Sequence, residues 1–173
     1  MRNTFSKVLL WLFVLNLGTA FGAGLYESLV VVPGWFSSSP GSPAVWNAAA
    51  AQGADTGQHF WIFVTTIPLS LLTLANLWAA WRSKGKVRAW WLTASLLAVA
   101  ERASTFIYFI PTMLQLMQDQ GMSQSDATAT ALQWADLNYF RHAIVLLAWI
   151  AALKALSMSG GKEVFVRRFG PYR

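Results

Sequence analysis

The chain has 173 residues, of which 55% are hydrophobic and only 12% are charged. This composition is typical of an integral membrane protein rather than a soluble domain. The formal net charge of +6 comes from Lys and Arg gathered at the termini and in one short loop, which indicates membrane topology and headgroup attraction, not nucleic-acid binding. The absence of cysteine excludes disulfides, thiolate chemistry and cysteine-ligated metals.

The first apolar segment, residues 8–32, exceeds the about 20 residues that a helix needs to cross a bilayer. Arg2 and Lys7 precede it as they would a signal peptide, but the apolar run is too long for one, and we expect an uncleaved helix. Polar and small residues recur on one helical face of this segment: Asn16, Ala20, Ala23 and Glu27. Glu27 is therefore expected to face protein.

The second segment, residues 58–81, follows a loop that contains no Lys or Arg and should face away from the cytoplasm. His59 begins a stripe of hydroxyl-bearing residues on one face, and Pro68 is expected to bend the helix. Hydroxyls in membrane helices often only bond backbone carbonyls, so packing is the simpler interpretation of this stripe. The strongly basic turn at residues 82–88 marks the cytoplasmic side.

The third segment, residues 90–117, carries Glu101 and Arg102 side by side near its middle. Charges at this depth are costly in hydrocarbon, so they indicate a partner or a function. A polar stripe runs from Glu101 toward the outer surface at helical spacing: Thr105, Tyr108, Thr112 and Gln115. Pro111 is expected to kink the helix there.

The fourth segment, residues 134–157 with a start as early as Ser125 left open, places Asn138 and Arg141 on one face, with His142 beside them. After it, the basic and aromatic tail at 160–173 is expected to lie on the cytoplasmic headgroups.

Three basic clusters agree on one topology. The prediction is an all-α integral membrane protein, a four-helix up-down-up-down bundle with N and C termini cytoplasmic, in the inner (plasma) membrane as a multi-pass protein. The lipid bilayer is its expected partner, and a homo-oligomer is left open.

The depths of the charged groups can be compared along the helices. Glu101 and Arg141 are each thirteen residues from a cytoplasmic basic residue, Arg88 and Lys154 respectively, which places both about 20 Å above the inner surface. An ion pair between Glu101 and Arg141 is therefore expected, flanked by Arg102 and His142. By the same rise, a second tier lies about 30 Å up: Glu27, His59 and Asp136.

Unpaired charges at such depth cost several kcal/mol each, so they require pairing or a water-filled cavity. A buried ion-pair network that only fixes the packing is one interpretation. The other is an outward-opening polar cavity that binds a lipophilic small molecule bearing oxygen atoms. In this hypothesis the catalytic residues are Glu27, Glu101 and His142, with Glu27 as proton acceptor, and the ligand-binding residues are Arg102, Tyr108, Asn138, Arg141 and His59.

A metal site is the weaker alternative, and no metal ligand is assigned. Di-iron carboxylate bundles need a Glu-x-x-His on each of two helices, and neither Glu27 nor Glu101 has a His three residues later. Haem ligation by two histidines is disfavoured because His59 and His142 lie at different depths. The cofactor is therefore left unknown.

Three short motifs carry a family resemblance: Gly22-Ala-Gly24 running on to Pro33, Phe109-Ile-Pro-Thr-Met-Leu114, and Trp134-Ala-Asp-Leu-Asn138-Tyr-Phe-Arg141. Together they resemble a family of small four-helix membrane proteins whose domain is described as anthrone-oxygenase-like. The resemblance implies relatives of which a few oxidise polycyclic anthrones without a known cofactor, while many have no assigned role. The matching positions are Pro33, Pro111, Asn138 and Arg141.

The leading hypothesis is thus ligand binding, with oxidoreductase or oxygenase chemistry on the ligand. One alternative is a proton-linked small transporter or channel, because acidic residues are staggered across the membrane. Another is a structural or assembly subunit of a membrane complex. Nucleotide-binding glycine loops, nucleophile elbows and His-Glu-x-x-His motifs are absent from the sequence, which disfavours soluble-cofactor chemistry.

Overall fold

A computed structural model describes residues 2–37, 41, 43–118 and 121–168, with side chains described between residues 4 and 159 of these ranges. The described chain is almost entirely helical, apart from one short antiparallel hairpin, in which Phe36 pairs with Trp46. The first helical stretch comprises α1 (Arg2–Tyr26), the π-helical η1 (Glu27–Val31) and the 3-10 turn η2 (Val32–Trp35). The hairpin and a short helix follow: β1 (Phe36–Ser37), β2 (Val45–Trp46) and α2 (Ala48–Ala54).

Three more helical stretches complete the chain. The second joins the π-helical η3 (Gly57–Thr66) to α3 (Ile67–Trp81). The third joins α4 (Lys86–Ser104), the π-helical η4 (Thr105–Phe109) and α5 (Ile110–Met117). The last is the uninterrupted α6 (Gln124–Arg168). Of the predicted tail at 160–173, the backbone to residue 168 continues α6, and residues 169–173 lie outside the described residues.

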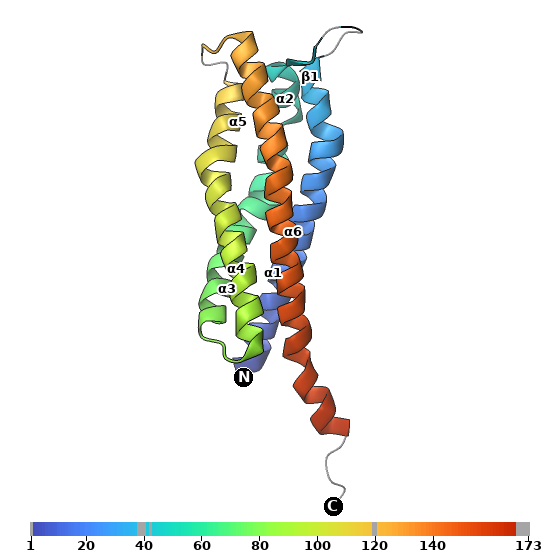
Figure 1. The fold of residues 1–173 in the computed structure, drawn as a ribbon, viewed down its shortest axis with the longest axis vertical. Coiled ribbons are helices and arrows are strands. Elements are labelled where there is room, and N and C mark those ends of the chain that lie inside the picture. The colour runs from blue at the N-terminus through green and yellow to red at the C-terminus, as the bar shows by residue number, and fades with distance from the viewer. Residues whose placement is uncertain (1, 38–40, 42, 119–120, 169–173) are drawn as a thin grey trace, which may run out of the picture.

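The helical stretches lie side by side along one long axis (Figure 1). α6 packs against α1 and α4, and α3 packs against both α1 and α4. The turn between α3 and α4 lies at the same end as the start of α1, which we call the turn end. β1, α2 and the end of α5 lie at the opposite end, which we call the loop end.

Three helical stretches are long and apolar enough to cross a membrane: Thr4–Trp35, Gly57–Trp81 and Gln124–Ser159. The predicted span at 90–117 is not among them, since Glu101, Arg102 and several hydroxyl-bearing residues lower its mean hydropathy. A fourth span therefore stays a prediction.

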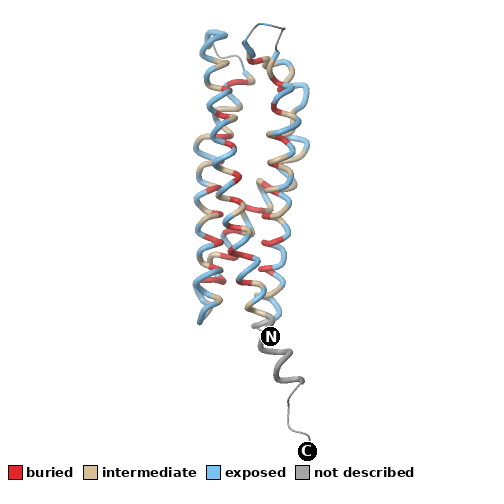
Figure 2. The backbone as a smooth tube through the Cα atoms, turned by 45° about the vertical axis from the view of Figure 1, so that its right-hand side comes forward, coloured by how far each residue is buried: buried red, intermediate tan, exposed pale blue. Residues whose placement is uncertain are grey.

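The turn-end half has a close-packed interior. α4 and α6 meet there through alanines, which allow the two helices to approach closely: Ala94, Ala98, Ala148, Ala151, Ala152 and Ala155. One polar cluster is embedded in this core, in which the indole of Trp91 donates to Asn76 Oδ1 at 2.9 Å and Asn76 Nδ2 donates to the Leu72 carbonyl at 2.8 Å. Figure 2 shows the buried positions of this half along the inner sides of the helices.

An aromatic cluster packs at the loop end and is formed by Trp35, Trp46, Phe109 and Trp134. Buried indole N–H groups usually find an acceptor: Trp46 donates to the Leu116 carbonyl at 3.2 Å and Trp134 to that of Phe109 at 3.0 Å, whereas the N–H of Trp35 has no acceptor among the described residues. These bonds fasten the hairpin and α6 to the third stretch.

Each π-helical segment ends just before a proline. Pro33, Pro68 and Pro111 stand two residues after η1, η3 and η4, and in each case the residue preceding the proline donates its N–H five residues back. Proline lacks an N–H and clashes with the carbonyl four residues earlier, so the helix accommodates it by widening. At Pro68 the carbonyl left without its helical donor is that of Val64, and Asn16 Nδ2 on α1 donates to it at 2.9 Å.

Candidate ligand-binding site

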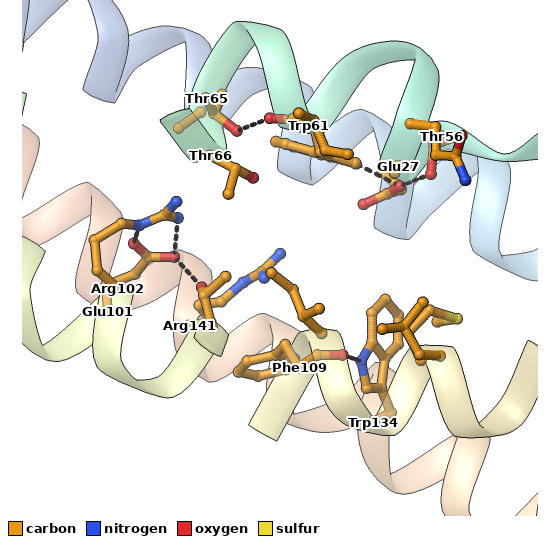
Figure 3. Close-up of a pocket in the computed structure, with 18 of the residues that line it drawn as sticks. Glu27, Thr56, Trp61, Thr65, Thr66, Glu101, Arg102, Phe109, Trp134 and Arg141 are labelled. Carbon is orange, nitrogen blue, oxygen red and sulfur yellow. Dashed lines mark hydrogen bonds and ion pairs between the residues drawn. The ribbon is translucent and has the colours of Figure 1, made fainter. Parts of the chain in front are cut away.

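A cavity of about 380 Å³ lies in the loop-end half, between α1, η3, the α4–α5 stretch and α6. All three π-helical segments line it, through Glu27 of η1, Trp61 and Thr65 of η3, and Thr105 and Phe109 of η4 (Figure 3). π-Helical turns occur frequently at functional sites. The widened turns therefore form the walls of the site.

The innermost carboxylate, Glu101, is paired with its own neighbour. Arg102 binds it with two hydrogen bonds, Nε to Oε2 at 2.6 Å and Nη2 to Oε1 at 2.7 Å, and the Thr105 hydroxyl donates to Oε1 at 2.9 Å. The predicted ion pair between Glu101 and Arg141 is therefore wrong about the partner. Counting residues along the helices placed the two groups at one height. It did not consider that the side chains of adjacent residues such as Glu101 and Arg102 can pair with each other.

Glu27 is held at the other side of the cavity. Its Oε1 accepts hydrogen bonds from the Thr56 hydroxyl at 2.5 Å and from the Trp61 indole at 2.7 Å. Its Oε2 has no hydrogen-bond partner in the part of the chain that the structure describes. One oxygen of a buried, fixed carboxylate is thus available to a ligand.

Arg141 enters the cavity from α6 and lies between the two carboxylates (Figure 3). Glu101 and Glu27 both attract it electrostatically, but among the described residues it has no hydrogen-bond acceptor. Its guanidinium carbon lies 4.6 Å from the ring centroid of Phe109, which provides a cation–π contact. Arg141 is thus a half-buried cation with unused donors, which makes it a candidate binding group of the cavity.

His142 lines the cavity beside Arg141 and contacts α1. Its Nε2 lies 2.9 Å from the Ser28 hydroxyl. The ring packs on Gly24, where a Cβ would come within 2.5 Å of Cε1. The close approach of His142 thus explains why residue 24 is a glycine.

Three predicted ligand-binding residues do not line the cavity: His59, Tyr108 and Asn138. His59 is exposed and bonds the Asp55 carbonyl at 3.0 Å, while Asn138 is buried and donates to the Trp134 carbonyl of its own helix at 3.0 Å. Tyr108 packs edge-on against Phe109. Of the second tier, Asp136 is also exposed.

The π-helical segments explain the positions of His59 and Tyr108. The predicted stripes assumed 3.6 residues per turn, whereas η3 and η4 place more residues in each turn. The cavity face therefore passes from Thr105 to Phe109 and Met113 instead of to Tyr108 and Thr112.

The sequence reasoning missed the two donors of Glu27. Thr56 directly precedes the second stretch and Trp61 lies near its start, at the loop end, which is the height at which Glu27 was expected. A buried carboxylate requires hydrogen-bond donors. A search of the sequence for donors at the height of Glu27 could therefore have found Thr56 and Trp61. Within the described residues, no cluster of three or more His, Cys, Asp or Glu forms a candidate metal site.

The fold and the site define a helical protein with three stretches long and apolar enough to cross a membrane, and with a cavity that is lined in part by charged side chains. Comparisons with known protein families, with curated proteins and with solved structures find no match. The resemblance to anthrone-oxygenase-like proteins therefore stays a prediction.

Proposed function

We propose that this is a multi-pass protein of the inner membrane that binds a lipophilic, oxygen-bearing small molecule in the cavity. The proposal includes a four-helix up-down-up-down bundle with cytoplasmic termini, so that the turn end faces the cytoplasm and the loop end faces outward. The observation that carries it is Arg141, a cation inside the cavity for which the described residues provide no acceptor.

The distribution of side chains supports this orientation. The turn between α3 and α4 carries Arg82 and Lys84, and the first turn of α4 adds Lys86 and Arg88. The described side chains of the loop end bear Asp55 and Asp126 and no Lys or Arg. The third stretch also exposes large apolar side chains, with Ile107 78% and Phe106 50% exposed. Such a surface suits contact with lipid, which supports a fourth span.

The charges of the cavity support ligand binding over a purely structural role. Glu101 is satisfied by Arg102 and Thr105 without any help from Arg141. A guanidinium that leaves water without gaining acceptors costs several kcal/mol. A ligand oxygen that accepts from Arg141 relieves this cost, and aromatic walls such as Trp134 and Phe109 suit an apolar ligand body.

Oxidoreductase chemistry, which the resemblance implies, gives the carboxylates different roles. Glu27 is the better proton acceptor because its Oε2 is uncommitted among the described residues, whereas both oxygens of Glu101 are bonded. Glu101 then serves to position Arg102, and His142 lies beside Arg141 as a second polar group.

The filled turn-end half favours binding over proton transport. On the turn-end side of the cavity, the described interior consists mainly of apolar side chains such as Leu10, Phe13 and Ala148. A transport path would need a continuous series of polar groups or waters through this region. The cavity is therefore best explained as a binding chamber.

Native mass spectrometry of the protein released from lipid nanodiscs tests the proposal. The parent should carry a bound small molecule in addition to the chain mass, and Arg141→Gln should lose it. Lys154→Gln, which removes an exposed cation from the same helix outside the cavity, is the matched control and should keep it. Equal occupancy in Arg141→Gln and Lys154→Gln would contradict the proposal.

A further inference from the structure

We infer that the cavity is loaded sideways from the bilayer, between η3 and α5, by a neutral single-chain amphiphile. This inference rests on the proposed function and adds the route and the chemical class of the ligand. The polar head of the amphiphile binds Arg141, and its chain extends past Ile62 and Leu114 into the lipid.

The side chains at this edge belong both to the cavity and to the outer surface. Ile62 of η3 and Leu114 of α5 line the cavity, yet they are 37% and 50% exposed. Ile110, which also lines the cavity, is half-buried. A cavity-lining residue that is also exposed marks the margin of an opening. The margin between η3 and α5 is apolar, whereas Gln58 forms a polar margin at the loop end.

The helices separate at this level for a local reason. On the turn-end side of the cavity, α3 packs directly against α4. On the loop-end side of Pro68, η3 packs against α1, while α5 packs against α6 and α2. The π-helical turns before Pro68 and Pro111 redirect the two stretches. The opening therefore follows from the prolines in the sequence.

The dimensions of the cavity limit how much of a long amphiphile it can hold. Its volume of about 380 Å³ is near the lower end of the roughly 300–1,000 Å³ typical of pockets for drug-sized ligands. A head group and the first part of a chain fit, and the remainder of a long chain lies outside. The apolar margin at Ile62 and Leu114 provides its exit.

The charged side chains that line the cavity indicate that the head group of the ligand is neutral. The charges of Glu27, Glu101, Arg102 and Arg141 cancel, and Asp55, which lines the cavity at the loop end, adds one negative formal charge. An anionic head would therefore be uncompensated and costly, and a cationic head would place a second positive charge beside Arg141. A neutral head with an acceptor oxygen for Arg141 and a hydroxyl that donates to Glu27 Oε2 satisfies both unused groups.

The experiment follows exchange of monooleoylglycerol for its deuterated form by native mass spectrometry, after delivery of the deuterated form to protein-containing nanodiscs. The double variant Ile62→Trp/Leu114→Trp adds bulk at the proposed opening. Gln58→Trp is the control, because Gln58 is an exposed lining residue at the loop end. We expect exchange to slow at least tenfold in the double variant, with little change in Gln58→Trp.

Each result decides one part of the inference. Unchanged exchange in the double variant, or slowing in Gln58→Trp instead, overturns the lateral route. Tighter binding of oleate than of monooleoylglycerol overturns the neutral head. If the parent retains its co-purified molecule through Arg141 but does not bind monooleoylglycerol, the inferred ligand class is wrong while the proposed function stands. If neither molecule depends on Arg141, the proposed function itself fails.

Discussion

Gly24→Ala tests the contact between α1 and the cavity residue His142. The added methyl group would lie 2.5 Å from Cε1 and 2.8 Å from Nδ1 of the ring, so the ring must move and its contact with Ser28 is lost. Overpacking costs about 1–3 kcal/mol and the lost hydrogen bond about 1 kcal/mol more. Gly22→Ala on the same helix is the matched control, since a methyl group added there would meet nothing within 4 Å.

The assay is thermal unfolding in nanodiscs, followed by circular dichroism. Both variants share the helix-propensity gain of alanine over glycine, about 0.5–1 kcal/mol, so their difference isolates the clash. A difference of about 2–4 kcal/mol corresponds to a melting temperature roughly 4–16 °C lower for Gly24→Ala than for Gly22→Ala. In a His142→Ala background the difference should disappear. Equal melting temperatures of the two single variants would refute the reasoning.

Three further stability measurements probe the polar contacts. Glu101→Gln leaves Arg102, whose side chain is only 11% exposed, without a counter-charge and should cost about 3–5 kcal/mol; Glu101→Gln/Arg102→Met should recover most of that loss, and a double variant as unstable as the single one would speak against the pair. Asn16→Leu removes the donor to the Val64 carbonyl and should cost about 1–3 kcal/mol, but much less in a Pro68→Ala background, where a backbone N–H returns; an unchanged cost there would count against the proline argument. Asn76→Leu deprives the Trp91 indole of its acceptor and should also cost about 1–3 kcal/mol, which chemical denaturation can measure; a smaller loss in Trp91→Phe is expected, and an equal one would contradict the contact.

The sequence was informative about where the helices lie in the chain and much less informative about which face of each helix is turned to the cavity. Apolar length and the basic turn at 82–88 are composition signals that survive any local change of helix geometry. A helical face is different, because one extra residue in a turn rotates everything after it. Thr105 stands at the start of η4 and lines the cavity, whereas Tyr108 lies three residues further into it and does not.

Partner choice among charged groups was also beyond the sequence. Depth could place Glu101, Arg141 and His142 in one layer, and all three line the cavity. Whether Arg102 would turn away or fold back onto Glu101 depends on side-chain rotamers that spacing does not encode. The bidentate contact between neighbours leaves Arg141 to the cavity, and this unused cation is the basis of the proposed ligand site.

The prolines that follow η1, η3 and η4 give the cavity a backbone origin. α6 is an uninterrupted α-helix, while each of the other three stretches contains an over-wide turn at the level of the chamber. The size and shape of the cavity are then controlled by how many residues each π-helical segment contains rather than by the bulk of the side chains. Removing a single residue from η4 together with Pro111→Ala would restore ordinary pitch, rotate α5 by about 100°, and replace the Met113 and Leu114 wall with a different face. Insertions and deletions, more than substitutions, are therefore the changes by which such a scaffold would acquire a new ligand.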